Sequence, residues 1–216
     1  MNRTITSSVF ALMLLFSAAA SHAGPIGITL ATIPLVGNPG SPFSLDFQFT
    51  DGSGTSDGNN TLTLTNFNFG GGSAGVPILI GAASGTVAGG FTLHDSSFFN
   101  DVTLPFTPGS TLSFTVTTTA NVDAGGTPDL FTFGILDRNG FNVPTMAGSF
   151  FDVFVEISLD STSPPVLTFA SDPSRPLSTG DATPRLAAPT ASPEPGGLLL
   201  LLGGAMALAG LRRWKG

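Results

Sequence analysis

A glycine-rich acidic stretch begins at Asp51 and reads Asp-Gly-Ser-Gly-Thr-Ser-Asp-Gly-Asn-Asn. Carboxylate, hydroxyl and amide oxygens on such a loop suit a hard cation such as calcium, with Asp51, Asp57 and Asn59 as candidate ligands. Asp123 and Asp129, around another turn, could add ligands from a second loop. The stretch is not an EF-hand loop, because its glycine is misplaced and no Glu closes it. The alternative is a turn held by side-chain to backbone hydrogen bonds.

Two adjacent aromatic residues, Phe98 and Phe99, stand in the sequence Ser-Phe-Phe-Asn-Asp. Consecutive strand residues point to opposite faces, so both rings cannot enter one core. An exposed ring can stack on a sugar, and this pair is the candidate for carbohydrate stacking. Sugar sites usually use Trp or Tyr, whereas this chain has no Tyr and its one Trp is Trp214. The alternative is a strand end with one ring under a loop.

Motifs for catalysis are weaker. Gly70–Gly75 matches G-x-G-x-x-G, but the dinucleotide fingerprint also needs a helix after it, and a short interrupted apolar run follows instead.

The chain has no Cys, which excludes disulfides, thiolate metal sites and cysteine nucleophiles. His94 and Asp95 would point to opposite faces of a strand. Glu156 has no partner carboxylate at a recognisable spacing. We therefore expect no enzyme activity, and a secreted hydrolase is the weakest alternative.

The charge of the body is strongly negative. Residues 24–192 contain thirteen acidic residues, three arginines and no lysine, for a net charge of −10. Such a body repels phosphate backbones, so nucleic acid is not an expected partner. Cations are its natural electrostatic partners.

The N-terminal residues Met1–Ala23 have the form of a secretory signal peptide. Arg3 is the positive residue, Val9–Phe16 is the apolar region, and small residues precede the junction between Ala23 and Gly24. This pattern predicts cleavage before Gly24. The alternative, an uncleaved anchor, is disfavoured because the apolar region is too short to span a bilayer well.

The C-terminus has three parts: the motif Pro193, Glu194 and Pro195, the uncharged stretch Gly196–Leu211, and the basic residues Arg212, Arg213 and Lys215. As a helix, the apolar part would be roughly 24 Å long, against about 30 Å of hydrocarbon. Local thinning and snorkelling of the basic side chains can cover the difference. The basic residues favour a cytoplasmic end. We expect a single helix in the inner membrane, with the body exported.

This arrangement resembles the PEP-CTERM sorting signal of Gram-negative bacteria. The resemblance implies cleavage near the motif by an exosortase, a membrane-embedded cysteine transpeptidase-like enzyme, and a biosynthetic link with exopolysaccharide. The stretches Ser41–Gly75 and Asn121–Asp137 also resemble an uncharacterised group of PEP-CTERM proteins, which implies no activity. The alternative, an ordinary C-terminal anchor, keeps the topology and removes the processing step.

A linker is expected between the body and this signal. The stretch Ser171–Pro195 contains six prolines, and Leu177 and Leu186 are its only large apolar residues. Proline-rich polar chain is extended and forms no core, with a reach of at most roughly 75 Å. We therefore expect a signal peptide over 1–23, a folded domain over 24–170, a linker over 171–191 that acts as a stalk, and the sorting signal over 192–216.

The body itself alternates apolar and polar residues with period two, which is typical of half-buried antiparallel strands. The alternating positions are Ile26–Leu30, Phe43–Phe49, Val102–Phe106, Leu112–Val116, Phe131–Ile135, Phe151–Leu159 and Leu167–Phe169. One phase change, near Thr65 and Asn66, predicts a β-bulge that returns Phe67 and Phe69 to the core. About nine strands predict an all-β, antiparallel two-sheet sandwich, jelly-roll-like or immunoglobulin-like, with a phenylalanine core.

Together these features predict an exported protein of the cell surface or of the extracellular biofilm matrix. It would be sorted and processed by an exosortase and would have a structural or adhesive role linked to exopolysaccharide. A calcium-assisted carbohydrate-binding module is the alternative function.

Overall fold

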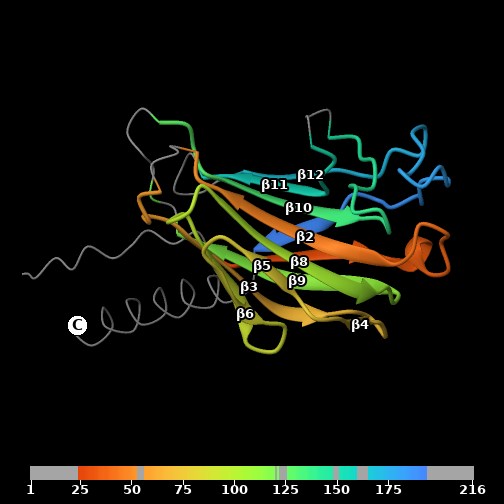
Figure 1. Ribbon diagram of the computed structural model, residues 1–216, viewed down its shortest axis with the longest axis horizontal. Helices are drawn as coiled ribbons and strands as arrows, with labels where there is room; N and C mark the ends of the chain where they lie inside the picture. Colours follow the sequence, from red (N-terminus) through yellow and green to blue (C-terminus); the bar gives the residue numbers. More distant parts are fainter. Residues whose placement is uncertain are drawn as a thin grey trace, which may run out of the picture.

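The computed structural model of the chain describes residues 24–52, 56–119, 121, 126–147, 151–159 and 165–193. These residues form two antiparallel sheets that pack face to face as a sandwich (Figure 1). The all-β sandwich expected from the alternating pattern is therefore confirmed.

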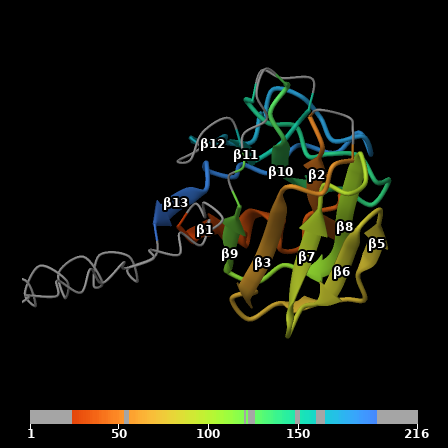
Figure 2. The ribbon, with the colours of Figure 1, turned by 90° about the vertical axis from the view of Figure 1, so that its left-hand side faces the viewer.

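The six-stranded sheet has the order β13 (Thr190–Pro193), β1 (Ile26–Ala31), β9 (Thr111–Thr118), β3 (Thr61–Asn68), β7 (Gly90–His94) and β6 (Ala83–Thr86). The seven-stranded sheet has the order β12 (Val166–Thr168), β11 (Val155–Ser158), β10 (Leu130–Leu136), β2 (Phe43–Thr50) and β8 (Phe99–Thr107), with β4 (Ser73–Ala74) and β5 (Ile78–Ile80) both paired to β8. A short 3-10 helix, η1 (Ile33–Leu35), follows β1. In Figure 2 the strands of the two sheets can be followed as two layers.

Phenylalanine rings join the two sheets. Phe47 on β2 is fully buried, and its ring centroid lies 5.1 Å from that of Phe133 on the neighbouring strand β10. Across the sandwich it lies 5.2 Å from Phe114 and 5.9 Å from Phe67, both in edge-on contact. Such edge-to-face geometry is favourable beyond the burial of area. Phe47 is therefore at the centre of the aromatic core.

The predicted β-bulge in β3 is confirmed. The register between β3 and β9 shifts between Thr65 and Asn68, and Asn66 has a positive φ of 56°. After the bulge, Phe67 and Phe69 pack against the core. Because the bulge adds one residue to β3, the side chains of Phe67 and Phe69 point toward the core, as the sequence pattern predicted.

Two strand expectations were wrong. The long alternating run was expected to begin at Phe151, but β11 begins at Val155, and Phe151 is 57% exposed. Val153 and Phe154 are both buried, so the backbone is irregular before the strand, and the Phe154 N–H donates to the carbonyl of Phe133. Leu167 was expected to face inward but is 47% exposed, because β12 turns Val166 toward the core instead.

The expected proline-rich stalk is the largest correction. Leu177 and Leu186 are each only 2% exposed and belong to the core. The Ser171 hydroxyl donates to the carbonyl of Pro184 at 2.7 Å, and β13 pairs with β1 from Ile26 opposite Pro193 to Thr29 opposite Thr190. Residues 171–193 are thus part of the folded body, because two leucines and one strand are enough to dock a chain whose composition favours extension.

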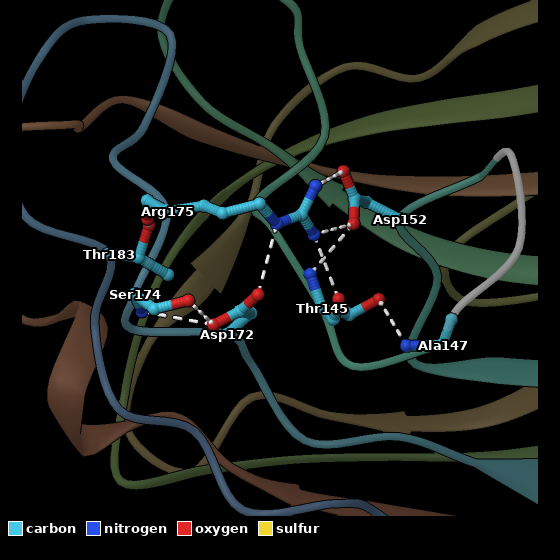
Figure 3. A network of polar contacts seen from close by, with 7 residues as sticks. All are labelled: Thr145, Ala147, Asp152, Asp172, Ser174, Arg175 and Thr183. Atoms are coloured by element: carbon cyan, nitrogen blue, oxygen red, sulfur yellow. Dashed lines mark hydrogen bonds and ion pairs between the residues drawn. The ribbon is translucent and has the colours of Figure 1, made fainter.

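Arg175 links the beginning of residues 171–193 to the rest of the body through ion pairs and hydrogen bonds (Figure 3). Its guanidinium group makes a bidentate ion pair with Asp152 and donates from Nε to Asp172 at 3.1 Å. It also donates to the carbonyl of Thr145 at 2.8 Å. A planar guanidinium with several fixed partners holds geometry better than an isolated surface pair.

The two ends of the described body lie together. Ile26 on β1 pairs with Pro193 on one side and with Val116, near the end of β9, on the other. Gly24 is the first described residue, so the predicted signal peptide and its junction at Ala23 lie outside the described part. Among the described residues no helix is long and apolar enough to cross a membrane. The expected span, Gly196–Leu211, also lies outside them.

Candidate functional site

One end of the sandwich, here called the loop end, brings distant polar residues together. Strands β2, β7 and β9 finish there, and β3, β8 and β10 begin there, as the pairings Thr50 with Phe99 and Thr61 with His94 show. Asp51 follows β2, Asp95 follows β7, and Asp129 precedes β10. The antiparallel register therefore gathers three aspartates that are far apart in the sequence.

Asn60, directly before β3, connects these aspartates. Its backbone N–H donates to Oδ2 of Asp95 at 2.7 Å, and its side-chain Nδ2 donates to Oδ2 of Asp129 at 2.8 Å. The other Asp129 oxygen, Oδ1, accepts the backbone N–H of Gly52 at 2.9 Å. The Asn60 side chain is itself fixed, because its Oδ1 accepts the backbone N–H of Asn121 at 2.9 Å. The two carboxyl groups are therefore held in place by donors from two segments, at Gly52 and at Asn60.

The electrostatics of this cluster are unfavourable for full ionisation. Burial, together with the nearby carboxylates of Asp129 and Asp57, raises the pKa of Asp95 to about 7, although the hydrogen bond from Asn60 acts in the opposite direction. Burial also raises the pKa of Asp129, and Asp51 adds to this effect. The cluster, hereafter the loop-end acidic cluster of Asp51, Asp95 and Asp129, concentrates negative charge in a partly desolvated place.

Two of the three arginines of the body form ion pairs with aspartates outside this cluster. Arg138 lies 3.5 Å from Asp181, and Arg175 pairs with Asp152 and Asp172. Arg185 lines a shallow hollow beside Met146. Residues 24–192 contain no lysine. In the part of the chain that the structure describes, no arginine is among the groups that shift the pKa of Asp95 or Asp129.

The predicted calcium ligands are only partly brought together. Asp51 is fully buried in the cluster, and its Oδ2 accepts the backbone N–H of Ser56 at 2.5 Å. Asp57 instead lies at the surface and accepts a hydrogen bond from Asn59 Nδ2 at 2.8 Å. Asp123 lies outside the described residues. Within the described ranges, no group of three or more His, Asp or Glu side chains is placed so that it could hold a metal ion.

The predicted sugar-stacking pair lies beside the same cluster. Phe98 is 58% exposed and Phe99 is 37% exposed. The carbonyl of Phe98 accepts the backbone N–H of Asp51 at 2.9 Å. Both rings thus reach the surface at the loop end, next to the first aspartate of the acidic loop. The structure joins two candidate sites that the sequence analysis could only treat separately.

The candidates for catalysis remain apart. The His94 ring lies 3.1 Å from the Thr61 hydroxyl, whereas the Asp95 carboxyl group turns to Asn60, so the two neighbours form no dyad. Glu156 lies on β11, paired with Thr132 of β10.

The glycine motif Gly70–Gly75 contains a turn at Gly70 and Gly71 and then the short strand β4, and no helix follows it in the described residues. A side chain at Gly72 would collide with the backbone of Thr107, since an added Cβ would lie only 2.0 Å from that carbonyl oxygen. The glycines therefore allow close packing of two chain segments.

A second buried carboxyl pair lies on the outer face of the seven-stranded sheet. Asp46 on β2 is 6% exposed and Asp101 on β8 is 4% exposed. Burial and, to a smaller extent, the charge of Asp101 together raise the pKa of Asp46 to about 7. Gln48 donates to Asp46 at 2.7 Å, and Thr103 donates to Asp101 at 2.7 Å. The alternating pattern puts Asp46, between Leu45 and Phe47, on the polar face of its strand and gives no sign of this pair.

Comparison of this chain with protein-family models, with curated protein sequences and with solved structures finds no match. The inferences about function therefore depend on the residues and geometry described above.

Proposed function

We propose that this chain is an exported β-sandwich protein of the bacterial envelope or extracellular matrix, sorted through its C-terminal motif by an exosortase. The main structural support is the pairing of Ile26 with Pro193. This pairing puts the first residue of the Pro-Glu-Pro motif at the boundary of the body, beside the expected signal-peptide junction at Gly24. The sandwich serves this role whether it is jelly-roll-like or immunoglobulin-like.

A consequence concerns the distance to the membrane. Because the chain is packed on the body up to Pro193, only Glu194 and Pro195 precede the apolar stretch that begins at Gly196. The stalk proposed from composition would hold the body far from the bilayer. We instead propose that the loop end is held close to the membrane until the signal is cut, and that Arg212, Arg213 and Lys215 keep the tail on the cytoplasmic side.

The sorting proposal is tested by changing the motif. Replacing Pro193, Glu194 and Pro195 together by alanine should leave the chain in the inner-membrane fraction, because the processing enzyme no longer recognises it. Pro189→Ala, a nearby proline change outside the motif, is the control and should be sorted normally. Fractionation followed by immunoblotting measures both. Normal sorting of the triple variant would contradict the proposal.

A second function, carbohydrate binding, is favoured by the position of Phe98. An exposed ring next to a polar, acidic loop offers a flat apolar surface for a sugar ring and oxygen groups for its hydroxyls. We propose exopolysaccharide as the carbohydrate, since the sorting signal resembles one that is linked to its biosynthesis. In this form the protein is a non-catalytic adhesive component of the matrix.

Carbohydrate binding is tested with purified exopolysaccharide of the host cell. Phe98→Ala should weaken binding by roughly tenfold, about 1.4 kcal/mol, because the variant loses the stacking surface. Phe141→Ala is the matched control, since Phe141 is 64% exposed but follows β10 at the opposite end of the sandwich. Equal loss in both variants, or none in either, would contradict binding at the loop end.

A further inference from the structure

Strand β5 is an edge of the seven-stranded sheet that carries large aliphatic side chains. It pairs with β8 on one side, and no described strand pairs with its other side. Its three residues are all exposed, Ile78 by 58%, Leu79 by 38% and Ile80 by 48%. Val76, just before the strand, is 82% exposed. An open edge also presents backbone N–H and C=O groups to which another strand can add.

The other edges of the described body lack this combination. At the opposite edge of the same sheet, β12 has one exposed aliphatic side chain, Leu167. The edge strands β4, β6 and β13 contain only alanine, glycine, serine, threonine and one proline. Charged side chains usually protect an exposed edge from pairing. On β5 this protection is missing, so its aliphatic surface is available to a partner.

The charge of the molecule favours a second copy as that partner. Residues 24–192 have a net charge of −10, so two copies repel each other over much of their surface. The stretch from 58 to 94, which forms strands β3 to β7, contains no aspartate, glutamate, lysine or arginine. Along β5, two copies therefore meet without carboxylates opposed on the pairing strands. A basic partner would instead be attracted to the acidic parts of the body.

We propose that β5 pairs antiparallel with β5 of a second copy, so that the two seven-stranded sheets join across a homodimer. In Figure 2, β5 lies at one side of the body and β1 and β13 lie at the other. Pairing through β5 therefore leaves both ends of the described chain free. This inference depends neither on exosortase sorting nor on carbohydrate binding.

The pairing is self-complementary about a two-fold axis at Leu79. Ile78 of one copy lies opposite Ile80 of the other, and Leu79 lies opposite Leu79. Ile78 and Ile80 are paired with Thr103 and Asp101 of β8, so they share the outer face of the sheet and form one aliphatic cluster with their copies.

The ends of the paired segment also fit. In the same register, Pro77 of one copy lies opposite Gly81 of the other, where no side chain meets the proline ring. Pro77 cannot donate a backbone hydrogen bond, so it limits the pairing to the three residues of β5.

The available area suits a reversible dimer. The exposed parts of the four aliphatic side chains supply roughly 400 Å² on each copy, against about 800 Å² per partner in a standard stable interface. Phe99, which is 37% exposed, lies beside Gly81 and extends the same edge. We therefore expect dissociation at micromolar concentrations, as in other small interfaces.

Cysteine cross-linking tests the pairing and its register. The chain has no cysteine, so one introduced thiol reports on one position. In the full chain, purified in mild detergent, Leu79→Cys should form a disulfide-linked dimer on mild oxidation, because opposed Cα atoms lie about 4.5–5.5 Å apart. Leu167→Cys, at a site that is 47% exposed on β12, is the matched control and should stay largely monomeric. Equal linkage of both variants, or none at position 79, would overturn the proposal.

Sedimentation velocity of the same preparation measures the equilibrium without a cross-link. The unchanged protein should dimerise reversibly over micromolar concentrations. Ile80→Lys should raise the dissociation constant at least tenfold, because each dimer contains the new charge twice, whereas Leu167→Lys should not change it. Circular dichroism checks that both variants are folded. A protein that stays monomeric would overturn the proposal, and so would a dimer that persists in Ile80→Lys, because the copies would then associate through another surface.

Discussion

Phe47→Ala is expected to lower the free energy of unfolding by about 3–5 kcal/mol, the range for removing a large aromatic side chain from a tight core. The Phe47 ring is fully buried and contacts Phe67 and Phe114 in the opposite sheet and Phe133 in its own. Its loss leaves a cavity at the junction of both sheets, which a rigid sandwich cannot close. Urea denaturation followed by far-ultraviolet circular dichroism measures the change.

Phe98→Ala is the matched control for this prediction, because it removes the same atoms from a ring that is 58% exposed. Its effect on the free energy of unfolding should stay within about 0.5 kcal/mol. Similar losses in the two variants would contradict the central position that the fold assigns to Phe47.

Asp46→Asn is expected to stabilise the protein at alkaline pH and to flatten its dependence on pH. Folding raises the pKa of Asp46 from 3.8 to about 7, so the folded chain binds its proton more tightly than the unfolded chain. The stabilising effect of the neutral group is complete below pH 4 and is lost as the pH rises through 7. Between pH 4 and pH 8, the free energy of unfolding of Asp46→Asn should therefore rise by about 2–4 kcal/mol relative to that of the unchanged protein.

The surroundings of Asp46 support this assignment. Asp101 is the ionisable group that faces it from β8, while β10 presents Gly134 opposite it. An added Cβ at Gly134 would meet Asn142 Oδ1, so the segment after β10 covers this part of the outer face. The neighbours are thus a second acid and uncharged groups, which favour the protonated form.

Asp172→Asn serves as a control of opposite sign. Hydrogen bonds from Ser174 and the charge of Arg175 lower the pKa of Asp172, so its contribution to stability is present at neutral pH and disappears in acid. This variant should be less stable than the unchanged protein at pH 7 and should approach it as the pH falls. Urea unfolding at a series of pH values measures both variants. If the difference in the free energy of unfolding between Asp46→Asn and the unchanged protein did not change with pH, this would contradict a proton bound by the buried Asp46–Asp101 pair.

Much of the sandwich could be predicted from alternation alone. In β2 the inward residues Phe43, Leu45, Phe47 and Phe49 are all fully buried, because a strand with one apolar face has only one stable register against a core. The bulge at Asn66 was predictable for the same reason, since the apolar phase changed in the middle of β3.

The docking of residues 171–193 could not be predicted from composition. Six prolines between Ser171 and Pro195 favour extended chain, and the two leucines are too few to form a core of their own. They are buried because the sandwich already offers an apolar surface, to which Leu177 and Leu186 add. A local pattern does not show what a segment meets in the tertiary structure.

The candidate site was partly predictable. The acidic loop after β2 was recognised from its oxygen-rich side chains, and Asp51 lies in the cluster. Asp95 was dismissed as a strand neighbour of His94, although it lies just after β7. The pairing of Thr61 with His94 is what brings Asp95 to Asn60, and strand pairing is not visible in one sequence. The one local signal for Asp95 in the sequence was its position directly after the apolar end of a strand.

The central claim, export followed by sorting through the C-terminal motif, is tested most directly by the intact mass of the protein recovered from cells with an active exosortase. Our proposal predicts a chain that begins at Gly24 and lacks the tail Arg212–Gly216. A recovered chain that still begins at Met1, or that retains the basic tail, would contradict it.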